Sequence, residues 1–140
     1  MYQKLTIVGR LGKDPEMRFT PTGQAVTNFS VATDRQWAQD GEKKKETTWF
    51  TVTAWGNQAE VCNQYLKKGS KVLVEGRLTP DKSTGGPRVW EKRDSTWGAS
   101  FEVTAEVVRF LSDRNESGDH AGQQAGSYAP GSDPTNDIPF

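Results

Sequence analysis

Cysteine and histidine are almost absent from this sequence of 140 residues, and it has no long apolar run. Cys62 is the only cysteine, which excludes a disulfide within the chain and fits a reducing compartment. No apolar stretch approaches the roughly 20 residues that a membrane-spanning helix needs. Because an alternating strand pattern begins directly after the first residues, we expect no signal peptide and a cytoplasmic protein without a membrane partner.

Residues that carry catalytic chemistry are also scarce. His120 is the only histidine, and it lies in a polar stretch where we interpret it as a solvent-exposed side chain. The acidic pairs Asp14/Glu16 and Asp40/Glu42 fall in expected turns, whereas a metal-dependent nuclease needs clustered carboxylates. The sequence therefore predicts a protein that is not an enzyme and has no cofactor and no metal site.

Charge is divided unevenly along the chain although it sums to zero. Residues 1–111 hold 17 Lys and Arg against 13 Asp and Glu, a net charge of +4, and residues 112–140 hold one against five, a net charge of −4. The second segment also lacks Leu, Val, Met and Trp. We expect residues 112–134 to be a flexible, disordered acidic linker, since they bury too little apolar area to offset ordering entropy. The basic body suggests a polyanionic partner.

Strand patterns dominate residues 1–111 and predict five strands, with one short helix between the third and the fourth. The expected strands cover residues 4–11, 25–35, 47–55, 70–78 and 100–111, and the helix covers residues 57–69. Cys62 falls on the apolar face of that helix and is interpreted as a small buried side chain. The chain shows no alternation of strands and helices, so we predict an all-β fold, a five-stranded OB-fold barrel.

The stretch "TTWFTVTAW", residues 47–55, divides its large side chains between two faces. Strand alternation gives the core face the side chains of Phe50, Val52 and Ala54. Trp49 and Trp55 lie on the other face, about 20 Å apart at roughly 3.3 Å per residue. Outward indoles are explained either as platforms for unpaired bases or as padding at a subunit interface or under a neighbouring hairpin.

Two polar segments mix cations with indoles. The first follows the second strand, where we expect a loop, and it carries Arg35, Trp37, Lys43, Lys44 and Lys45. The second is a long hairpin within residues 79–100, and it carries Arg88, Trp90, Lys92, Arg93 and Trp97. Aromatic platforms mixed with Lys and Arg bind single-stranded nucleic acid with little sequence preference. In a paired duplex the neighbouring base pairs cover the faces of each base, so the pattern favours single-stranded DNA.

Three stretches resemble the bacterial single-stranded DNA-binding protein (SSB) family. They are "LTIVGRLGKDPEMRFTPTGQAVTNFSVAT", "TTWFTVTAWGNQAEVCNQYLKKGSKVLVEGRL" and the terminal "DIPF". The resemblance implies an OB fold, a homotetramer in most members, and single-stranded DNA wrapped over the surface. It also implies a nucleoid-associated protein that protects this DNA and acts in DNA replication, recombination and repair.

The resemblance also assigns residues. Base-stacking positions of the family fall on Trp37, Trp49 and Trp55, the last of which is usually phenylalanine. Basic positions fall on Lys4, Arg18 and Lys68, with Lys67 and Arg10 as neighbours. The family's hairpin tryptophan has no aligned counterpart, so the choice between Trp90 and Trp97 stays open. Phe50 stands where some relatives carry a histidine at a subunit contact.

The chain ends on residues 135–140, which we interpret as a partner-binding tip. Ile138 and Phe140 would fill an apolar pocket on another protein, and Asp137 with the terminal carboxylate would pair with basic residues at its rim. Pro139 would reduce the conformations lost on binding. The resemblance implies that the partners are enzymes of replication, recombination and repair.

Two alternatives to binding of single-stranded DNA stay open. A protein-interaction adaptor with an OB body would bury Trp37, Trp49 and Trp55 against its partner. An OB protein for RNA or structured tRNA uses the same residue types.

Overall fold

Seven strands and one helix occupy residues 1–111, the part of the chain that the computed structural model describes. The elements are β1 (Leu5–Leu11), β2 (Glu16–Phe19), β3 (Ala25–Gln39), β4 (Glu42–Trp55), α1 (Asn57–Tyr65), β5 (Lys71–Leu78), β6 (Arg88–Glu91) and β7 (Trp97–Phe110). The predicted disordered linker and the predicted tip lie outside the described residues.

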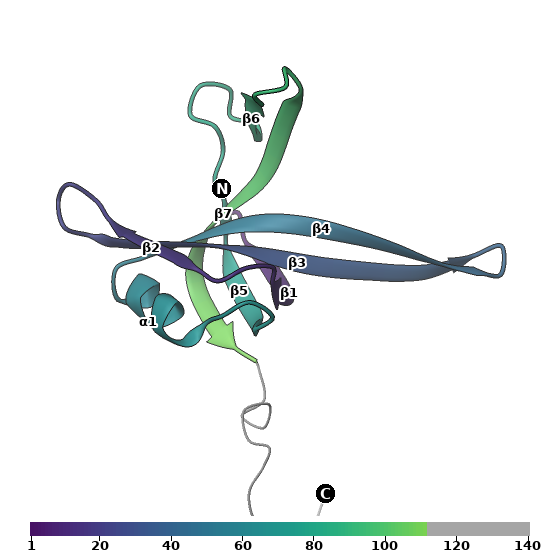
Figure 1. The fold of residues 1–140 in the computed structure, drawn as a ribbon, viewed down its shortest axis with the longest axis horizontal. Coiled ribbons are helices and arrows are strands. Elements are labelled where there is room, and N and C mark those ends of the chain that lie inside the picture. Colours follow the sequence, from purple (N-terminus) through teal and green to yellow (C-terminus); the bar gives the residue numbers. More distant parts are fainter. Residues whose placement is uncertain (112–140) are drawn as a thin grey trace, which may run out of the picture.

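Five of these strands close into a barrel (Figure 1). β1 pairs with β5, β5 with β7, β7 with β4, β4 with β3, and β3 again with β1. All of these pairs are antiparallel except β4 with β7, which is parallel. The helix α1 follows β4 and precedes β5, between the third and the fourth barrel strands. The predicted five-stranded OB-fold barrel with one short helix is therefore confirmed.

The interior of the barrel is made by the inward faces of the barrel strands and by the buried side of α1. Its buried side chains include Ile7, Leu11, Phe29, Val31, Val52, Ala54, Val72, Val74, Val103 and, from the helix, Ala59 and Cys62. The Thr27 hydroxyl donates a buried hydrogen bond of 2.7 Å to the carbonyl oxygen of Ala59, which joins β3 to α1. Burial also raises the pKa of the Cys62 thiol to about 11, so Cys62 stays protonated at neutral pH.

The prediction of a loop after residue 35 is wrong. β3 and β4 continue beyond the barrel as a two-stranded ribbon, and the pairing runs to Gln39 opposite Glu42 (Figure 1, at the right). The two turn residues, Asp40 and Gly41, have φ angles of 53° and 78°. A two-residue turn with positive φ at both positions matches the twist of a hairpin, and Asp-Gly is a preferred sequence for it. Trp37 therefore lies in a strand.

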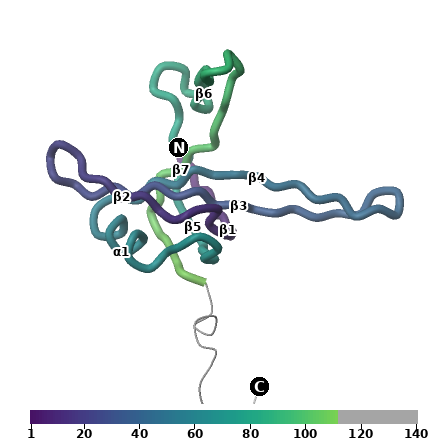
Figure 2. The backbone as a smooth tube through the Cα atoms, in the orientation of Figure 1, coloured from purple at the N-terminus to yellow at the C-terminus, as the bar shows by residue number. Residues whose placement is uncertain are grey.

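Two further segments differ from the sequence prediction. Glu16, expected in a turn, is the first residue of the short strand β2, which pairs with β3. The last strand begins at Trp97 instead of residue 100, because β6 pairs with the first part of β7. These two strands form a second ribbon, which projects from the barrel at an angle to the first (Figure 2).

Candidate nucleic-acid interface

Trp49 and Trp55 lie on the outer face of β4, as strand alternation predicts. Their exposed fractions are 53% and 43%, whereas Val52 and Ala54, which point into the barrel, have no exposed area. Phe50 is only partly buried and packs against the core, as expected for its face. The buried residues fix the strand, so the two outward indoles are held rigidly on the outer surface of the barrel. This surface, the outward face of β4 and of the strands beside it, is called the wall below.

An arginine lies two strands away from each of these tryptophans, on the same face. Trp49 on β4 and Arg10 on β1 are both paired with Ala32 of β3. Trp55 on β4 and Arg18 on β2 are both paired with Val26 of β3. Adjacent strands lie about 4.8 Å apart, so the backbones of each pair are separated by roughly 10 Å. The wall therefore carries an indole and an arginine on the same line of paired residues at two places.

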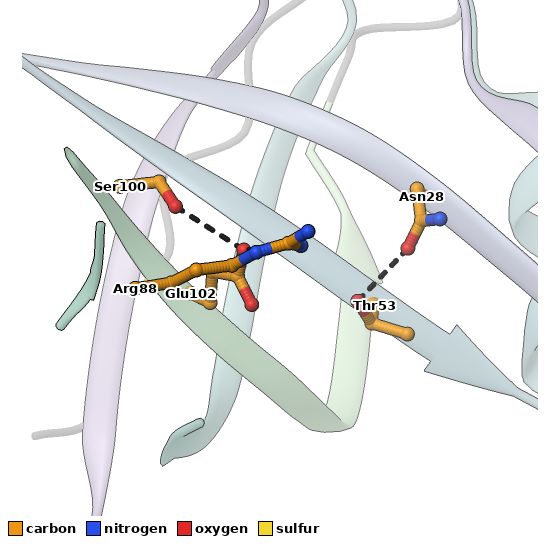
Figure 3. A network of polar contacts seen from close by, with 5 residues as sticks. All are labelled: Asn28, Thr53, Arg88, Ser100 and Glu102. Atoms are coloured by element: carbon orange, nitrogen blue, oxygen red, sulfur yellow. Dashed lines mark hydrogen bonds and ion pairs between the residues drawn. The ribbon is translucent and has the colours of Figure 1, made fainter. Parts of the chain in front are cut away.

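The surface between and beyond the two indoles is polar. The Thr53 hydroxyl donates to Asn28 Oδ1 at 2.9 Å across β3 and β4 (Figure 3). Toward the end of the ribbon, Thr47 donates to one oxygen of Asp34 at 2.7 Å, and Lys45 lies 3.2 Å from the other. The hydrogen bond from Thr47, and then Lys45, lower the pKa of Asp34. Asp34 is thus charged at neutral pH and reduces the positive charge that Lys45 offers to a phosphate.

Trp37 lies on the opposite face of the ribbon from Trp49. It is paired with Lys44 and occupies the β3 face that points into the core nearer the barrel. Beyond the barrel no core exists, and the ring is exposed. The guanidinium of Arg35 lies over it, 5.3 Å from the ring centre, a cation–π contact. The ribbon therefore carries indoles on both of its faces.

Strand alternation also separates Trp90 from Trp97. Trp90 is paired with Gly98, and Glu102 on the same face of β7 is paired with Thr51 of β4. Thr51 lies on the outer face of β4, so the face that carries Trp90 continues the wall described above. Trp97 lies on the other face of β7 and is the most exposed of the tryptophans in residues 1–111, at 69%.

Arg88, paired with Ser100 across the second ribbon, already has an acidic partner. Its guanidinium lies 3.3 Å from Glu102, and the Ser100 hydroxyl donates to the same carboxylate at 3.1 Å (Figure 3). Arg93 is exposed near the end of this ribbon and has no ion pair within the described residues. Arg93 is therefore the freer of the two cations for a phosphate contact.

The remaining predicted cations divide into two places. Arg10 donates to the carbonyl oxygen of Gly69 at 2.9 Å, next to the exposed loop that holds Lys67 and Lys68. Lys4 lies at the opposite end of β1. Its ammonium forms a 2.9 Å ion pair with Glu75, which raises the pKa of Lys4 through a hydrogen bond and its negative charge. The structure thus brings Arg10, Lys67 and Lys68 together and leaves Lys4 separate from them.

An aromatic pair lies on another part of the barrel. The Phe50 and Phe101 rings are 5.9 Å apart, and Phe101 is exposed. Phe101 also lines a cavity of about 810 Å³, together with Tyr2, Leu78, Pro80 and Pro87. None of the tryptophans lines this cavity. Its lining also includes the charged residues Arg77, Glu102 and Glu106, so apolar and charged side chains are mixed there.

Within residues 1–111, no group of three His, Cys, Asp or Glu side chains could hold a metal ion. No helix in this part of the chain is long and apolar enough to cross a membrane.

Sequence reasoning missed two features of the site. The first is the long ribbon of β3 and β4, which could have been predicted from the Asp40-Gly41 dipeptide at its turn. The other feature is Gly12, which lies against Trp49 and has no signal in the local sequence.

Comparison with known proteins gives one consistent result. The single-strand binding protein family matches residues 2–111 of this chain. The single-stranded DNA-binding protein of Neisseria meningitidis serogroup A is 37% identical over 124 residues, which cover 88% of this chain and 67% of that protein. That of Wolinella succinogenes is 37% identical over 130 residues, covering 91% and 76%. Among solved structures, the Plasmodium falciparum SSB complex with ssDNA matches with a TM-score of 0.63 and 25% identity, covering 80% of this chain and 96% of that one. The resemblance noted in the sequence is confirmed, and the chain belongs to the single-strand binding protein family.

Proposed function

We propose that this chain binds single-stranded DNA with little sequence preference and does so as a binding protein, not an enzyme. The observation that carries the proposal is the wall of the barrel, where Trp49 and Trp55 are exposed. Arg10 lies in line with Trp49, and Arg18 with Trp55, across the paired strands. Relatives named for this activity, and a similar structure described as an SSB complex with ssDNA, support it.

The proposed contacts follow from the faces of the strands. Bases stack on Trp49 and Trp55 and, where the wall continues onto the second ribbon, on Trp90. Trp37 and Arg35 add a platform and a cation on the other face of the first ribbon. The proposed phosphate contacts are made by Lys4, Arg10, Arg18, Arg35, Lys67, Lys68 and Arg93. Lys4 contributes least, because a phosphate has to compete with Glu75 for its ammonium.

Magnitudes explain the preference for single strands. A stacked base contributes on the order of 1–3 kcal/mol, provided that its face is free. In a duplex the neighbouring base pairs cover that face, which removes this contribution and leaves the electrostatic one. The electrostatic contribution is modest for a body of net charge +4, from 17 basic and 13 acidic residues. Stacking therefore supplies most of the affinity that salt does not remove, and it makes little distinction among bases.

A titration of tryptophan fluorescence with poly-dT tests the proposal. We expect strong quenching, and an affinity whose logarithm falls with log salt at a slope near −3.5 if about five cations contact phosphates. Duplex DNA is expected to quench little. Unchanged fluorescence on adding poly-dT would support the adaptor alternative, and displacement of dT by oligo-U at equal concentration would support an RNA ligand.

We also propose that the chain assembles as a homotetramer. Phe50 and Phe101 form an aromatic pair beside a cavity whose lining includes the apolar side chains of Tyr2 and Leu78. Phe50 stands where some relatives carry a histidine at a subunit contact, and exposed aromatic surface is typical of contacts between copies. Light scattering in the same titration would give the mass of the assembly.

We propose a division of labour along the chain. Residues 1–111 bind DNA, residues 112–134 are a flexible linker, and residues 135–140 recruit enzymes of replication, recombination and repair. The basis for the tip is its sequence, in which Ile138 and Phe140 are apolar and Asp137 adds a negative charge beside the terminal carboxylate. A flexible connection would keep the tip within reach of partners while the body holds DNA.

Deleting residues 137–140 is expected to leave poly-dT affinity within about twofold and to abolish recruitment. The physical reason is that the wall of the barrel contains none of the deleted side chains. Columns that carry the full chain and the shortened chain, loaded with the same bacterial extract, would be compared by mass spectrometry. Proteins retained only by the full chain, and eluted by a TNDIPF peptide, are the expected result; identical retention on both columns contradicts it.

A further inference from the structure

Gly12, the residue after β1, lies against the indole of Trp49. A Cβ atom added to Gly12 would lie 2.4 Å from Cζ3 and 2.7 Å from Cη2 of that ring, closer than carbon atoms pack. These two atoms form the far edge of the six-membered ring. The edge of the ring that is most distant from the β4 backbone is therefore held over a position with no side chain.

The backbone at Gly12 is fixed on both sides. Its amide donates to the carbonyl oxygen of Ser30 at 3.1 Å. The preceding residue, Leu11, is buried and exchanges backbone hydrogen bonds with Gly69 and Ser70. A side chain at Gly12 would therefore displace the half-exposed indole and not the strand.

The close-approach glycines of residues 1–111 fall into two kinds. A Cβ on Gly9 or Gly76 would lie 2.2 or 2.1 Å from a backbone carbonyl oxygen of the neighbouring strand. These two glycines let barrel strands approach each other. A Cβ on Gly12 or Gly98 would instead meet an indole first. Fold closure therefore explains Gly9 and Gly76 and leaves Gly12 and Gly98 to be explained.

We propose that Gly12 is a positioning residue that fixes the orientation of the Trp49 indole before DNA binds. The proposal rests on the proposed function, in which Trp49 stacks a base. An exposed tryptophan on a strand has several rotamers, and a base can stack only on a ring whose face is presented to it. Holding the far edge of the ring restricts those rotamers in the free protein, so less conformational freedom is lost on binding.

The same arrangement recurs on the second ribbon. A Cβ on Gly98 would lie 2.8 Å from Cε2, 2.9 Å from Cζ2 and 3.1 Å from Nε1 of Trp90, its partner across the strands. Trp90 is 41% exposed in spite of this contact. A second indole on the same wall is thus held over a glycine.

The test is a double-mutant cycle on the full chain with poly-dT as the probe. Gly12→Ala is expected to weaken binding on the order of fivefold or more, because the ring is displaced. In the Trp49→Ala background, Gly12→Ala is expected to change the affinity less than twofold, because there is no longer a ring to position. Labelling with 7-fluorotryptophan, which places the fluorine on Cζ2 and away from the contact with Gly12, gives a second measurement, in which Gly12→Ala shifts the fluorine resonance of Trp49 without any DNA present.

Gly86→Ala is the matched control, since its Cβ would meet only Thr84 Oγ1 at 3.7 Å. It is expected to leave both the affinity and the Trp49 resonance unchanged. Equal losses from Gly12→Ala with and without Trp49, or an unchanged Trp49 resonance, would overturn the proposal. If the wild-type chain does not bind poly-dT, the proposed function fails. The DNA-free resonance then still decides whether Gly12 orients the ring.

Discussion

Replacing Trp49 and Trp55 together by alanine is expected to weaken binding of single-stranded DNA by about 2–6 kcal/mol, roughly 30-fold to more than 10⁴-fold. In the proposed binding mode each indole stacks one base and contributes on the order of 1–3 kcal/mol. Both rings are about half exposed, so their removal leaves the core intact. Because the double variant loses part of its intrinsic fluorescence, the affinity is best measured by anisotropy of a labelled dT oligonucleotide.

Trp97→Ala provides the control for this experiment. Trp97 is the more exposed indole of the second ribbon, but it lies on the face opposite to the proposed DNA-binding wall. Its removal is expected to change the affinity by less than about twofold. A double variant of Trp49 and Trp55 that still binds within threefold of the wild type would contradict base stacking on the wall. An equal loss from Trp97→Ala would contradict the assignment of faces.

Replacing Phe29 by alanine is expected to lower the free energy of unfolding by about 3–5 kcal/mol, as is usual for a large buried aromatic ring. Phe29 is 1% exposed and is the largest fully buried side chain of residues 1–111. It points into the core from β3, and its neighbours Asn28 and Ser30 point outward to the wall. The packing of Phe29 therefore helps to fix the position of that outer surface. Urea unfolding followed by circular dichroism would measure the loss.

Phe19→Ala is the corresponding control, because the same side chain lies on the edge strand β2 with 60% of its area exposed. Its removal is expected to cost less than about 1 kcal/mol. Similar losses at both positions would mean that the interior is not packed around Phe29. A Phe29→Ala variant that loses stability but binds dT normally while folded would show that the wall tolerates a cavity beneath it.

Local patterns were sufficient to predict the barrel strands and the direction of their side chains. In β4, buried Val52 and Ala54 alternate with exposed Trp49 and Trp55, because one face of the strand meets the core and the other meets water. A half-buried strand of this kind carries its orientation in its own sequence. The prediction of two outward indoles therefore needed no knowledge of the neighbouring strands.

The ribbon was missed because the same rule does not apply to it. From Asp34 to Gln39, and from Glu42 to Thr47, both faces are solvated, so no alternation of apolar and polar residues marks the strands. Only the turn residues indicate the hairpin, and the cations around them are typical of a loop.

Contacts between distant strands could not be predicted from sequence patterns. Arg10 lies in line with Trp49 only because β1 pairs with β3. The register of that pair cannot be predicted from the sequence of either strand alone. Gly12 depends on the same pairing. The placement of Trp90 and Trp97 on opposite faces, in contrast, follows from alternation once β7 is known to begin at Trp97.

The position of Trp37 and Trp49 on opposite faces of one ribbon has a mechanical consequence. A polymer that touches both rings has to turn around the ribbon's edge, over a width of roughly 10 Å for two strands. Duplex DNA resists bending over lengths of about 500 Å and cannot follow so tight a path, whereas an unpaired strand can. The stiffness of duplex DNA would then prevent it from contacting both indoles, independently of whether its bases could stack.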